Sequence, residues 1–295
     1  MIIMSDNKPV LGFIGIGLMG SRMSQRLLNA EYSLSIWNRT QEKMDALCSQ
    51  GARRCRTLKE LTQQSDILLL CLANTQVVEN ILEQIEPFAK NNQIIIDLSS
   101  IDPAQTRQFA DRMNQYGVHW VDAPVSGGTA GAEQGTLAIM AGGESHAVAV
   151  AQTILKPLYQ QFTHMGPVGS GQVTKVCNQM IVSCNMLVIA EMMALAEAAG
   201  VETAKIPTAL KGGFADSKPL QIAGPEMASR CFEPIKWKVE TLLKDLNLAV
   251  ELSKRHQSAV PMSGLAHQLM ELHAQQGYRD QDPSTLIQLF SDPSC

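Results

Sequence analysis

A glycine pattern placed between a strand and a helix constrains this chain more than any other feature. The segment Gly15–Gly20, Gly-Ile-Gly-Leu-Met-Gly, directly follows the apolar run Val10–Ile14 and opens a segment with helical spacing, Leu18–Ala30. In that setting the first glycine permits a tight turn, the second lets a pyrophosphate approach the backbone, and the third lets the helix pack on the strand. Unpaired N–H groups at the helix N-terminus then attract the phosphates. The pattern therefore predicts a dinucleotide-binding loop.

The first 165 or so residues alternate short apolar runs with amphipathic segments, as in strands joined by crossover helices. The predicted strands are Val10–Ile14, Leu34–Trp37, Ile67–Leu72, Ile94–Leu98, His119–Asp122 and Leu137–Ala141. The predicted helices are Leu18–Ala30, Gln41–Gln50, Leu58–Gln63, Thr75–Phe88 and Pro103–Tyr116. We therefore expect a doubly wound α/β domain of the Rossmann type over residues 1–169.

The pattern changes after Gly171. A long apolar helix is predicted over Gln172–Ala199, and Gly200 is a suitable residue to end it. Further helical segments at 203–212, 219–229, 235–255, 261–276 and 283–291 have a proline at or near their starts. Residues 170–295 are therefore expected to form an all-α domain, joined to the first domain by the long helix.

Charge and composition favour an ordinary globular protein in the cytoplasm. The 24 Lys and Arg residues against 28 Asp and Glu residues give a formal net charge of -4, with no basic stripe for nucleic acid. No secretory signal is visible at the N-terminus. The most membrane-like stretch, Val176–Ala190, is too short and too polar to span a bilayer, so no membrane partner is expected.

The cysteines and histidines give no sign of a metal centre. The seven cysteines are scattered without a Cys-x-x-Cys pair and are expected to be reduced thiols. The six histidines show no metal-ligand spacing, and even His267 and His273 do not share a helix face. We therefore expect no bound metal.

The residues at the end of the second predicted strand bear on which dinucleotide binds. NAD-specific sites place Asp or Glu about 20 residues after the glycine loop, whereas this chain has Asn38-Arg39-Thr40. A guanidinium there can stack on adenine and pair with a 2′-phosphate. We therefore expect NADP(H) to be preferred. NAD(H) is also possible, since Arg39 can instead be a solvated surface residue.

Two further segments carry candidate chemistry. Ser126-Gly127-Gly128 follows the carboxyl end of a strand, where backbone N–H groups and the serine hydroxyl can hold a small carboxylate; the alternative is a plain turn. Lys175 falls in the first turn of the long helix, which suits a general acid. Asn178 lies one turn further and faces the same way. The alternative for Lys175 is a side chain that extends to solvent.

Five motifs occur along the chain in the same order as in one enzyme family. They are Gly12–Gly20, Asp97–Ser100, Asp122–Gly128, Gly169–Gln179 and Lys244–Ala249. With these motifs the chain resembles the β-hydroxyacid dehydrogenase family over essentially its whole length. The segments Lys175–Gln179, Gly212–Ser217 and Lys244–Leu248 resemble the tartronate semialdehyde reductase branch most.

The resemblance implies an NAD(P)-dependent oxidoreductase that interconverts a small carboxylate-bearing semialdehyde, similar to tartronate semialdehyde, and its hydroxy acid by hydride transfer. Lys175 would be the catalytic acid and base. The substrate would be held by Ser126, Gly127, Gly128, Asn178, Gln179 and Trp237. The cofactor would meet Gly15, Ile16, Gly17, Leu18, Met19, Gly20, Asn38, Arg39, Thr40, Leu72, Ala73, Ser100 and Lys244, with Asp245 steadying Lys244 or the catalytic lysine. Some members carry Asn in place of Gln179 and Phe in place of Trp237, which leaves the size of the substrate open.

Other functions remain open at this point. Within the family, the alternatives are a 3-hydroxyisobutyrate dehydrogenase and a glyoxylate/succinic semialdehyde reductase. Outside it, the alternative is a catalytically silent dinucleotide-binding scaffold or sensor, which the presence of Lys175, Asn178 and Ser126 disfavours. A decarboxylase similar to 6-phosphogluconate dehydrogenase would have a longer chain, and an imine reductase would lack Lys175. The helical second half carries more apolar surface than it can easily bury alone, so we expect a homodimer or homotetramer.

Overall fold

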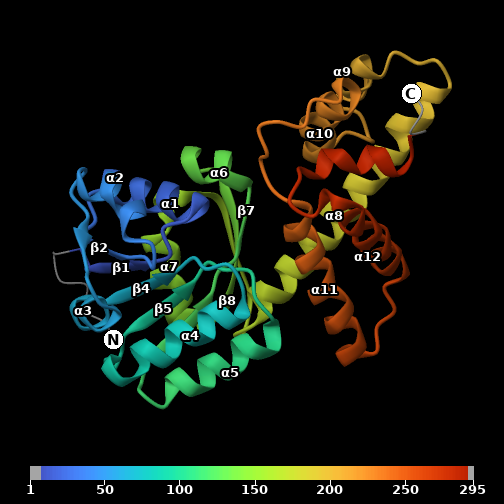
Figure 1. Cartoon of the computed structure of the whole chain (residues 1–295). Coiled ribbons are helices and arrows are strands. Elements are labelled where there is room, and N and C mark those ends of the chain that lie inside the picture. The colour runs from blue at the N-terminus through green and yellow to red at the C-terminus, as the bar shows by residue number, and fades with distance from the viewer. Residues whose placement is uncertain (1–7, 292–295) are drawn as a thin grey trace. The chain divides into compact units, whose positions relative to one another are not determined.

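The computed structural model describes residues 8–291, and the chain divides into two units at Lys175 and Val176. Each unit has its own hydrophobic core. Figure 1 shows both units, with elements labelled where there is room.

The first unit is built on a mixed sheet in the order β3-β2-β1-β4-β5-β6-β8-β7, with β9 paired to β8. Its strands are β1 (Leu11–Ile14), β2 (Leu34–Trp37), β3 (Arg53–Arg54), β4 (Ile67–Leu70), β5 (Ile94–Asp97), β6 (His119–Asp122), β7 (Val125–Ser126), β8 (Leu137–Gly143) and β9 (Tyr159–Gly166). Strands β1 to β6 are parallel, and β8 is antiparallel to β6 and β7. The order reverses at β1, between β2 and β4. Ligands of such sheets bind at this reversal, outside the carboxyl ends of the strands.

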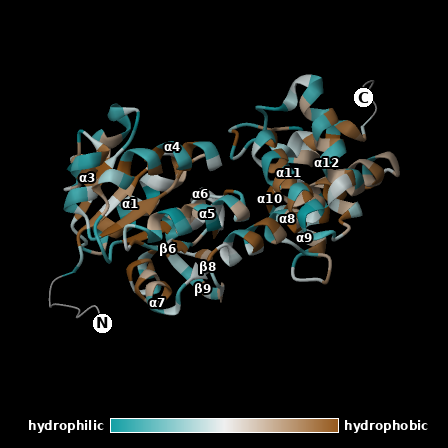
Figure 2. Cartoon of the chain, turned by 90° about the horizontal axis from the view of Figure 1, so that it is seen from below, coloured by the Kyte–Doolittle hydropathy of each residue, from teal (hydrophilic) through white to brown (hydrophobic). Residues whose placement is uncertain are grey.

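Helices cover both faces of this sheet (Figure 1). They are α1 (Leu18–Asn29), α2 (Asp45–Cys48), α3 (Leu58–Gln64), α4 (Thr75–Ile85), α5 (Pro103–Asn114), α6 (Gly128–Gln134) and α7 (Ser145–Ile154). Successive strand residues point to opposite faces. Leu69 of β4 therefore joins the core under α1, α6 and α7, whereas Leu68 and Leu70 join the core under α3, α4 and α5. Figure 2 shows brown, hydrophobic strands within the first unit. The doubly wound arrangement predicted from the sequence is confirmed.

Strand β9 was not predicted from the sequence, and its residues explain why. Most side chains of Tyr159–Gly166 are exposed or half-buried, and the strand pairs with β8 outside the main strand order. A strand without a buried face leaves no alternation of apolar and polar residues to detect. The short helices α6 and α7 were also missed.

The described part of the second unit contains helices joined by turns and loops, and no strand. Its elements are α8 (Ser170–Ala198), which begins in the first unit, α9 (Ile206–Leu210), α10 (Lys218–Ser229), α11 (Val239–His256) and α12 (Pro261–His273), followed by a π turn (Ala274–Tyr278) and a 3-10 helix (Pro283–Leu289). The core of the unit contains Met186 and Met193 of α8, Leu246 of α11 and Met270 of α12. The predicted all-α second half is therefore confirmed. The helix predicted over 235–255 begins later, at Val239; ahead of it, the backbone N–H of Lys236 donates to the carboxylate of Asp282 at 3.0 Å.

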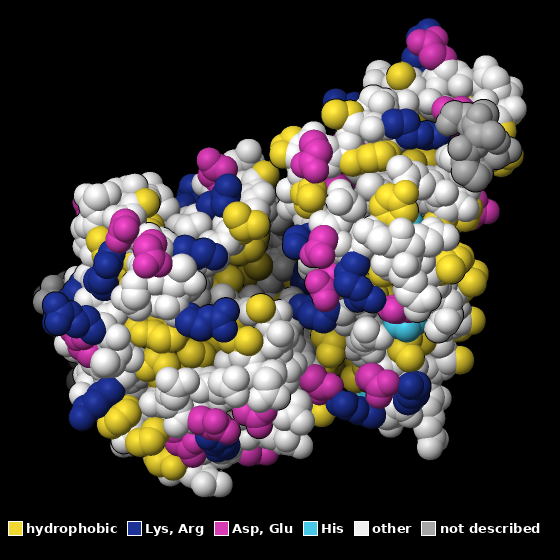
Figure 3. Space-filling model, viewed as in Figure 1, with side chains coloured by type: hydrophobic (Ala, Val, Ile, Leu, Met, Phe, Trp, Pro, Cys, Tyr) yellow, Lys and Arg dark blue, Asp and Glu magenta, His cyan; other side chains and the backbone are white. Residues whose placement is uncertain are grey.

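Within residues 8–291, α8 is the one helix that is long and apolar enough to cross a membrane, judged by length and composition alone. The core helix of a soluble protein meets the same criteria, and α8 supplies six residues to the core of the second unit, from Met186 to Ala194. Its length is therefore weak support for a membrane span. Basic and acidic side chains are interspersed over the face of the molecule shown in Figure 3.

Candidate active site

The glycine loop between β1 and α1 has the shape that a dinucleotide requires. Gly15 has a φ of 104°, and a Cβ there would lie 2.2 Å from the carbonyl oxygen of Cys71. A Cβ on Gly20 would lie 2.0 Å from the carbonyl oxygen of Gly15. At Gly17, the N-cap residue of α1, such a Cβ would meet no atom within 4 Å. There is thus no room for a side chain at Gly15 or Gly20. The space beside Gly17 is open, and this is where a phosphate has to approach.

The N-terminus of α1 is free to receive negative charge. The helix has no side-chain cap and no acidic residue in its first turn. Its first N–H groups lack partners within the helix and carry partial positive charge. Among the other loop residues, Ile16 is buried, Met19 is half-buried and Leu18 is exposed. These residues fit the diphosphate of a dinucleotide.

The predicted residues after β2 divide into two roles. The side chain of Asn38 accepts the backbone N–H of Ile16 at 2.9 Å and donates to the carbonyl oxygen of Thr40 at 2.8 Å. Asn38 therefore fastens the end of β2 to the glycine loop. Arg39 is exposed and makes no ion pair with any residue of the described chain, so its guanidinium is accessible to a ligand.

The ends of β4 and β5 are joined by Ser99 and Gln172, which were not among the predicted site residues. The Ser99 hydroxyl accepts the backbone N–H of Leu72 at 2.9 Å. The side chain of Gln172 donates to the Ser99 carbonyl at 2.8 Å and accepts from the Ile101 N–H at 3.2 Å. Of the predicted cofactor-binding residues in this region, Leu72 and Ser100 are half-buried and Ala73 is exposed. Gln172 is 1% exposed, and an amide side chain at the start of an apolar helix was the signal available in the sequence.

Two buried carboxyl groups end neighbouring strands. Asp97 of β5 and Asp122 of β6 are register partners, and both are fully buried. Burial raises the pKa of Asp97 to about 7. Burial also raises the pKa of Asp122 to about 6, although hydrogen bonds from the backbone N–H groups of Gly169 and Gln172 oppose the shift. In the sequence, this pair could have been found as two acidic residues that each end an apolar strand.

The turn after β7 presents backbone N–H groups next to a serine. Ser126 ends β7, and Gly127 and Gly128 follow with φ values of 134° and 64°. Gly127 is the N-cap residue of α6 and has no side chain to occupy the N–H groups. A Cβ on Gly128 would meet nothing within 4 Å. Successive N–H groups in such a turn form a concave site for an anion.

Lys175 lies deeper in its helix than the sequence predicted. Helix α8 begins at Ser170, two residues before the predicted start, so Lys175 is in the second turn and not the first. The residue is 9% exposed. A lysine that extends into solvent does not fit this burial.

In the second unit, four of the predicted residues lie together. The side chain of Asn178 donates to Gln179 at 2.8 Å, and Gln179 donates in turn to the carboxylate of Asp245. The ammonium of Lys244 lies 3.3 Å from the same carboxylate. Gln179 is 7% exposed and Asp245 is 3% exposed, so both are engaged inside the unit. Trp237 is half-buried and packs against the core of this unit.

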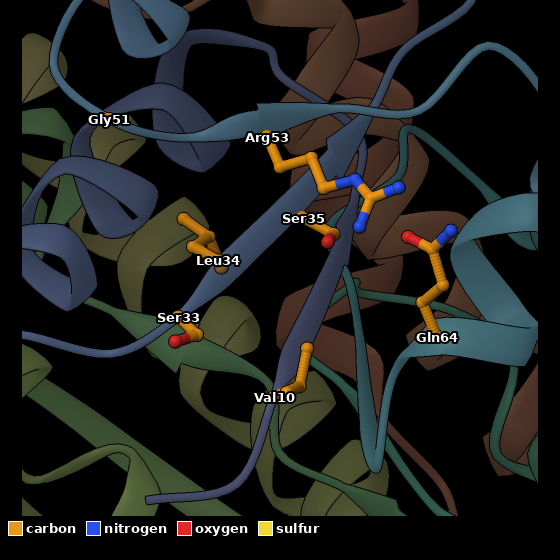
Figure 4. Close-up of a pocket in the computed structure, with 7 residues that line it drawn as sticks. All are labelled: Val10, Ser33, Leu34, Ser35, Gly51, Arg53 and Gln64. Atoms are coloured by element: carbon orange, nitrogen blue, oxygen red, sulfur yellow. The ribbon is translucent and has the colours of Figure 1, made fainter.

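A separate hollow of about 460 Å³ lies at the other end of the sheet. Figure 4 shows the residues that line it, which are Val10, Ser33, Leu34, Ser35, Gly51, Arg53 and Gln64. These residues surround the amino ends of β1 and β2. Because dinucleotides bind at the carboxyl ends of such strands, this hollow is not the candidate cofactor site.

Comparison with known proteins decides the family. A family model described as the NAD binding domain of 6-phosphogluconate dehydrogenase matches residues 10–166. A second, described as NAD-binding of NADP-dependent 3-hydroxyisobutyrate dehydrogenase, matches residues 169–290. The chain belongs to the β-hydroxyacid dehydrogenase family. It is an NAD(P)-dependent dehydrogenase of this family, as the resemblance of its motifs implied.

Named relatives of this β-hydroxyacid dehydrogenase cover nearly its whole length. The 2-hydroxy-3-oxopropionate reductase of Escherichia coli is 36% identical over 94% of this chain and 96% of its own. The NAD-dependent L-serine dehydrogenase of Pseudomonas aeruginosa is 33% identical over 96% of this chain and 98% of its own. A solved structure of Mycobacterium tuberculosis 3-hydroxyisobutyrate dehydrogenase with L-serine is 26% identical, has a TM-score of 0.87 and covers 96% of this chain and 99% of its own.

Proposed function

We propose that this β-hydroxyacid dehydrogenase interconverts a small carboxylate-bearing semialdehyde, tartronate semialdehyde or a close analogue, and its hydroxy acid, with Lys175 as the general acid and base. The observation that carries the proposal is the burial of Lys175 on a helix whose first turn is hydrogen-bonded to Asp122 and Ser99. The 36% identity to 2-hydroxy-3-oxopropionate reductase supports this substrate class.

The proposed chemistry divides between the cofactor and the protein. A nicotinamide cofactor, when bound, would supply the hydride in reduction and accept it in oxidation. The Lys175 ammonium donates a proton to the aldehyde oxygen as negative charge develops on it, and the neutral amine takes that proton back from the hydroxyl group in the oxidation. The Ser126 hydroxyl and the N–H groups of Gly127 and Gly128 hold the substrate carboxylate.

The remaining proposed roles belong to residues of the second unit. Asn178 lies one turn after Lys175 on α8, so its amide is assigned to the substrate. Gln179 holds Asn178 by one hydrogen bond and Asp245 by another, which makes Gln179 a positioning residue. Lys244, paired with Asp245, is assigned to the cofactor. Trp237 is assigned to the substrate.

The preferred cofactor is proposed to be NADP(H), with NAD(H) as the second possibility. Arg39 is exposed at the end of β2 and has no ion pair in the described chain. No acidic residue stands in the segment Asn38–Thr40 to accept from a ribose 2′-hydroxyl. A guanidinium in that position favours a 2′-phosphate.

We also propose a cytoplasmic homodimer or homotetramer. Ile181, Val188 and Leu195 lie seven residues apart on one face of α8 and are 65%, 56% and 70% exposed. Large apolar side chains repeated at this spacing are typical of a helix that packs against another chain. Light scattering at micromolar concentration tests the assembly: the protein is expected to be a dimer or tetramer, and a monomer would refute it.

Turnover with a defined substrate panel tests the proposed function. Oxidation of NADPH and of NADH is followed separately with tartronate, methylmalonate and succinic semialdehydes and with glyoxylate, and L-serine is assayed in the oxidative direction. Lys175→Ala should lower turnover by roughly 10²–10⁴-fold and leave cofactor binding intact. The exposed Lys218→Ala is the control and should behave as the unmodified enzyme. Substantial turnover by Lys175→Ala would refute the acid–base assignment.

A further inference from the structure

Two imidazoles and one carboxylate meet at the amino end of strand β6. His119 is the first residue of β6, Glu144 is the N-cap residue of α7, and His146 lies in the first turn of α7. One ligand atom from each of the three side chains lies within 4.8 Å of the others. His119 is separated from the other two by 25 residues or more, so spacing along the sequence could not reveal the cluster.

The distances within this cluster already approach those of a metal site. Nδ1 of His119 lies 3.1 Å from Oε2 of Glu144, and Nδ1 of His146 lies 3.5 Å from the same oxygen. Around a tetrahedral zinc ion, ligand atoms at about 2.0–2.1 Å from the metal are about 3.3 Å apart. The two imidazole planes cross at 90°, with ring centroids 4.4 Å apart, so the rings do not stack on each other.

The backbone around the cluster is held by the sheet and by the core. Gly143, directly before Glu144, pairs with Val121 of β6. Its φ is 151°, and a Cβ there would lie 2.9 Å from the carbonyl oxygen of Trp120. Ala147 and Val148, directly after His146, are buried in the core under α7. The backbone beside Glu144 and His146 is thus held in place, so that adjustment to an ion has to come from rotation of the side chains.

We propose that His119, Glu144 and His146 form a binding site for a single first-row transition-metal dication, such as Zn²⁺. Two neutral imidazoles and a carboxylate suit zinc, nickel or copper better than the harder Ca²⁺ or Mg²⁺, which prefer oxygen ligands alone. The side chains are 25%, 64% and 52% exposed, so an ion can enter from solvent and keep water in its remaining position. This proposal departs from the absence of metal expected from the sequence.

The site is remote from the proposed chemistry. His119 begins β6 and Asp122 ends it, three residues on, which separates their Cα atoms by about 10 Å along the strand. A bound ion would tie the start of β6 to the start of α7 and would touch no residue assigned to the substrate or cofactor. Turnover in the substrate panel should therefore be unchanged by substitutions in the cluster.

Calorimetric titration of the untagged full-length protein with ZnCl₂ tests the proposal. The protein should bind one equivalent. His146→Gln and Glu144→Gln should each weaken binding by at least ~10-fold. Removing a residue that only supports a metal ligand already costs about this much affinity, so removing a ligand should cost no less. His256→Gln, which removes an exposed histidine of α11, is the matched control and should bind as the unmodified protein does. Circular dichroism establishes that the variants remain folded.

A second measurement separates the cluster from the cysteines. Cys177 and Cys231 are exposed and could bind Zn²⁺ through thiolates. Co²⁺ bound at His119, Glu144 and His146 should give visible absorption bands without the strong thiolate charge-transfer absorption. The proposal is overturned if no saturable binding occurs, if His146→Gln and Glu144→Gln bind as tightly as the unmodified protein, or if the cobalt spectrum is that of a thiolate complex.

Discussion

The carboxylate of Asp122 accepts the backbone N–H of Gln172 at 2.9 Å, although the two residues are 50 positions apart in the chain. The other oxygen of the same carboxylate accepts the N–H of Gly169 at 2.7 Å. Asp122 thus takes up N–H groups at the start of α8, which have no partners within that helix. Because Lys175 stands three residues after Gln172 on α8, these bonds determine where the proposed catalytic lysine lies.

Asp122→Asn should impair turnover more than binding. An asparagine has one oxygen, so its amide nitrogen would face a backbone N–H that it cannot bind. We expect kcat to fall on the order of 10-fold or more, since small displacements of a reacting group are costly, while the dissociation constant of the cofactor stays the same. Steady-state kinetics and cofactor titration measure the two quantities. Asp111→Asn, on the exposed face of α5, is the control, and an unchanged kcat in Asp122→Asn would refute the positioning role.

Alanine at Gly17 should weaken cofactor binding, whereas alanine at Gly20 should lower the stability of the fold. Gly17 has a φ of -94° and open space at its Cβ position, so Gly17→Ala should fold normally. The added methyl would stand where the phosphate approaches, and we expect the cofactor dissociation constant to rise on the order of 10-fold. Gly20→Ala would place its Cβ against the Gly15 carbonyl and should destabilise folding by about 1–3 kcal/mol. Thermal unfolding and cofactor titration of both variants check this; a destabilised Gly17→Ala would contradict it.

Arg39→Ala should change cofactor preference. If the guanidinium pairs with the 2′-phosphate, its loss should weaken NADPH binding on the order of 10-fold, as expected for a hydrogen bond to a charged group. NADH binding should change little. Fluorescence titration with each nucleotide measures the ratio, with the exposed Arg56→Ala as control. Equal losses of affinity for NADPH and NADH would show that Arg39 does not bind the 2′-phosphate.

The stability of the first unit should depend on pH through Asp97. Its pKa is about 7 in the folded protein against an ordinary value of 3.8, so the folded state holds the proton more tightly than the unfolded chain. The contribution of Asp97 to the free energy of unfolding is complete below about pH 4 and is lost as the pH rises to about 7. Asp97→Asn stays neutral and keeps an oxygen for the N–H of Ser99. Urea unfolding at about pH 5 and about pH 8 should therefore show a smaller loss of stability in Asp97→Asn than in the unmodified protein. An equal loss in both proteins would contradict the assignment.

The sequence predicted local features well and distant partnerships poorly. The glycine loop, the strand-helix alternation and the long helix follow from residues close together in the chain, where period and turn chemistry apply. The bonds from Asp122 to Gly169 and from Gln179 to Asp245 join residues 47 and 66 positions apart, and no periodicity encodes them. The depth of Lys175 was misjudged because the helix takes in Ser170 and Gly171 before the first strongly apolar residue.

The order of strands in the sheet also governs when the first unit can be completed during synthesis. Strand β6 leaves the ribosome before β8, its neighbour in the sheet, and before Gly169 and Gln172. Until those residues emerge, burial of the Asp122 carboxylate would leave it without its hydrogen-bond partners. The carboxyl end of β6 can therefore be buried with all of its hydrogen bonds only after translation has passed the first turn of α8. A ribosome stalled earlier would hold a nascent chain with every glycine of the loop in place and the Asp122 carboxylate still without its partners.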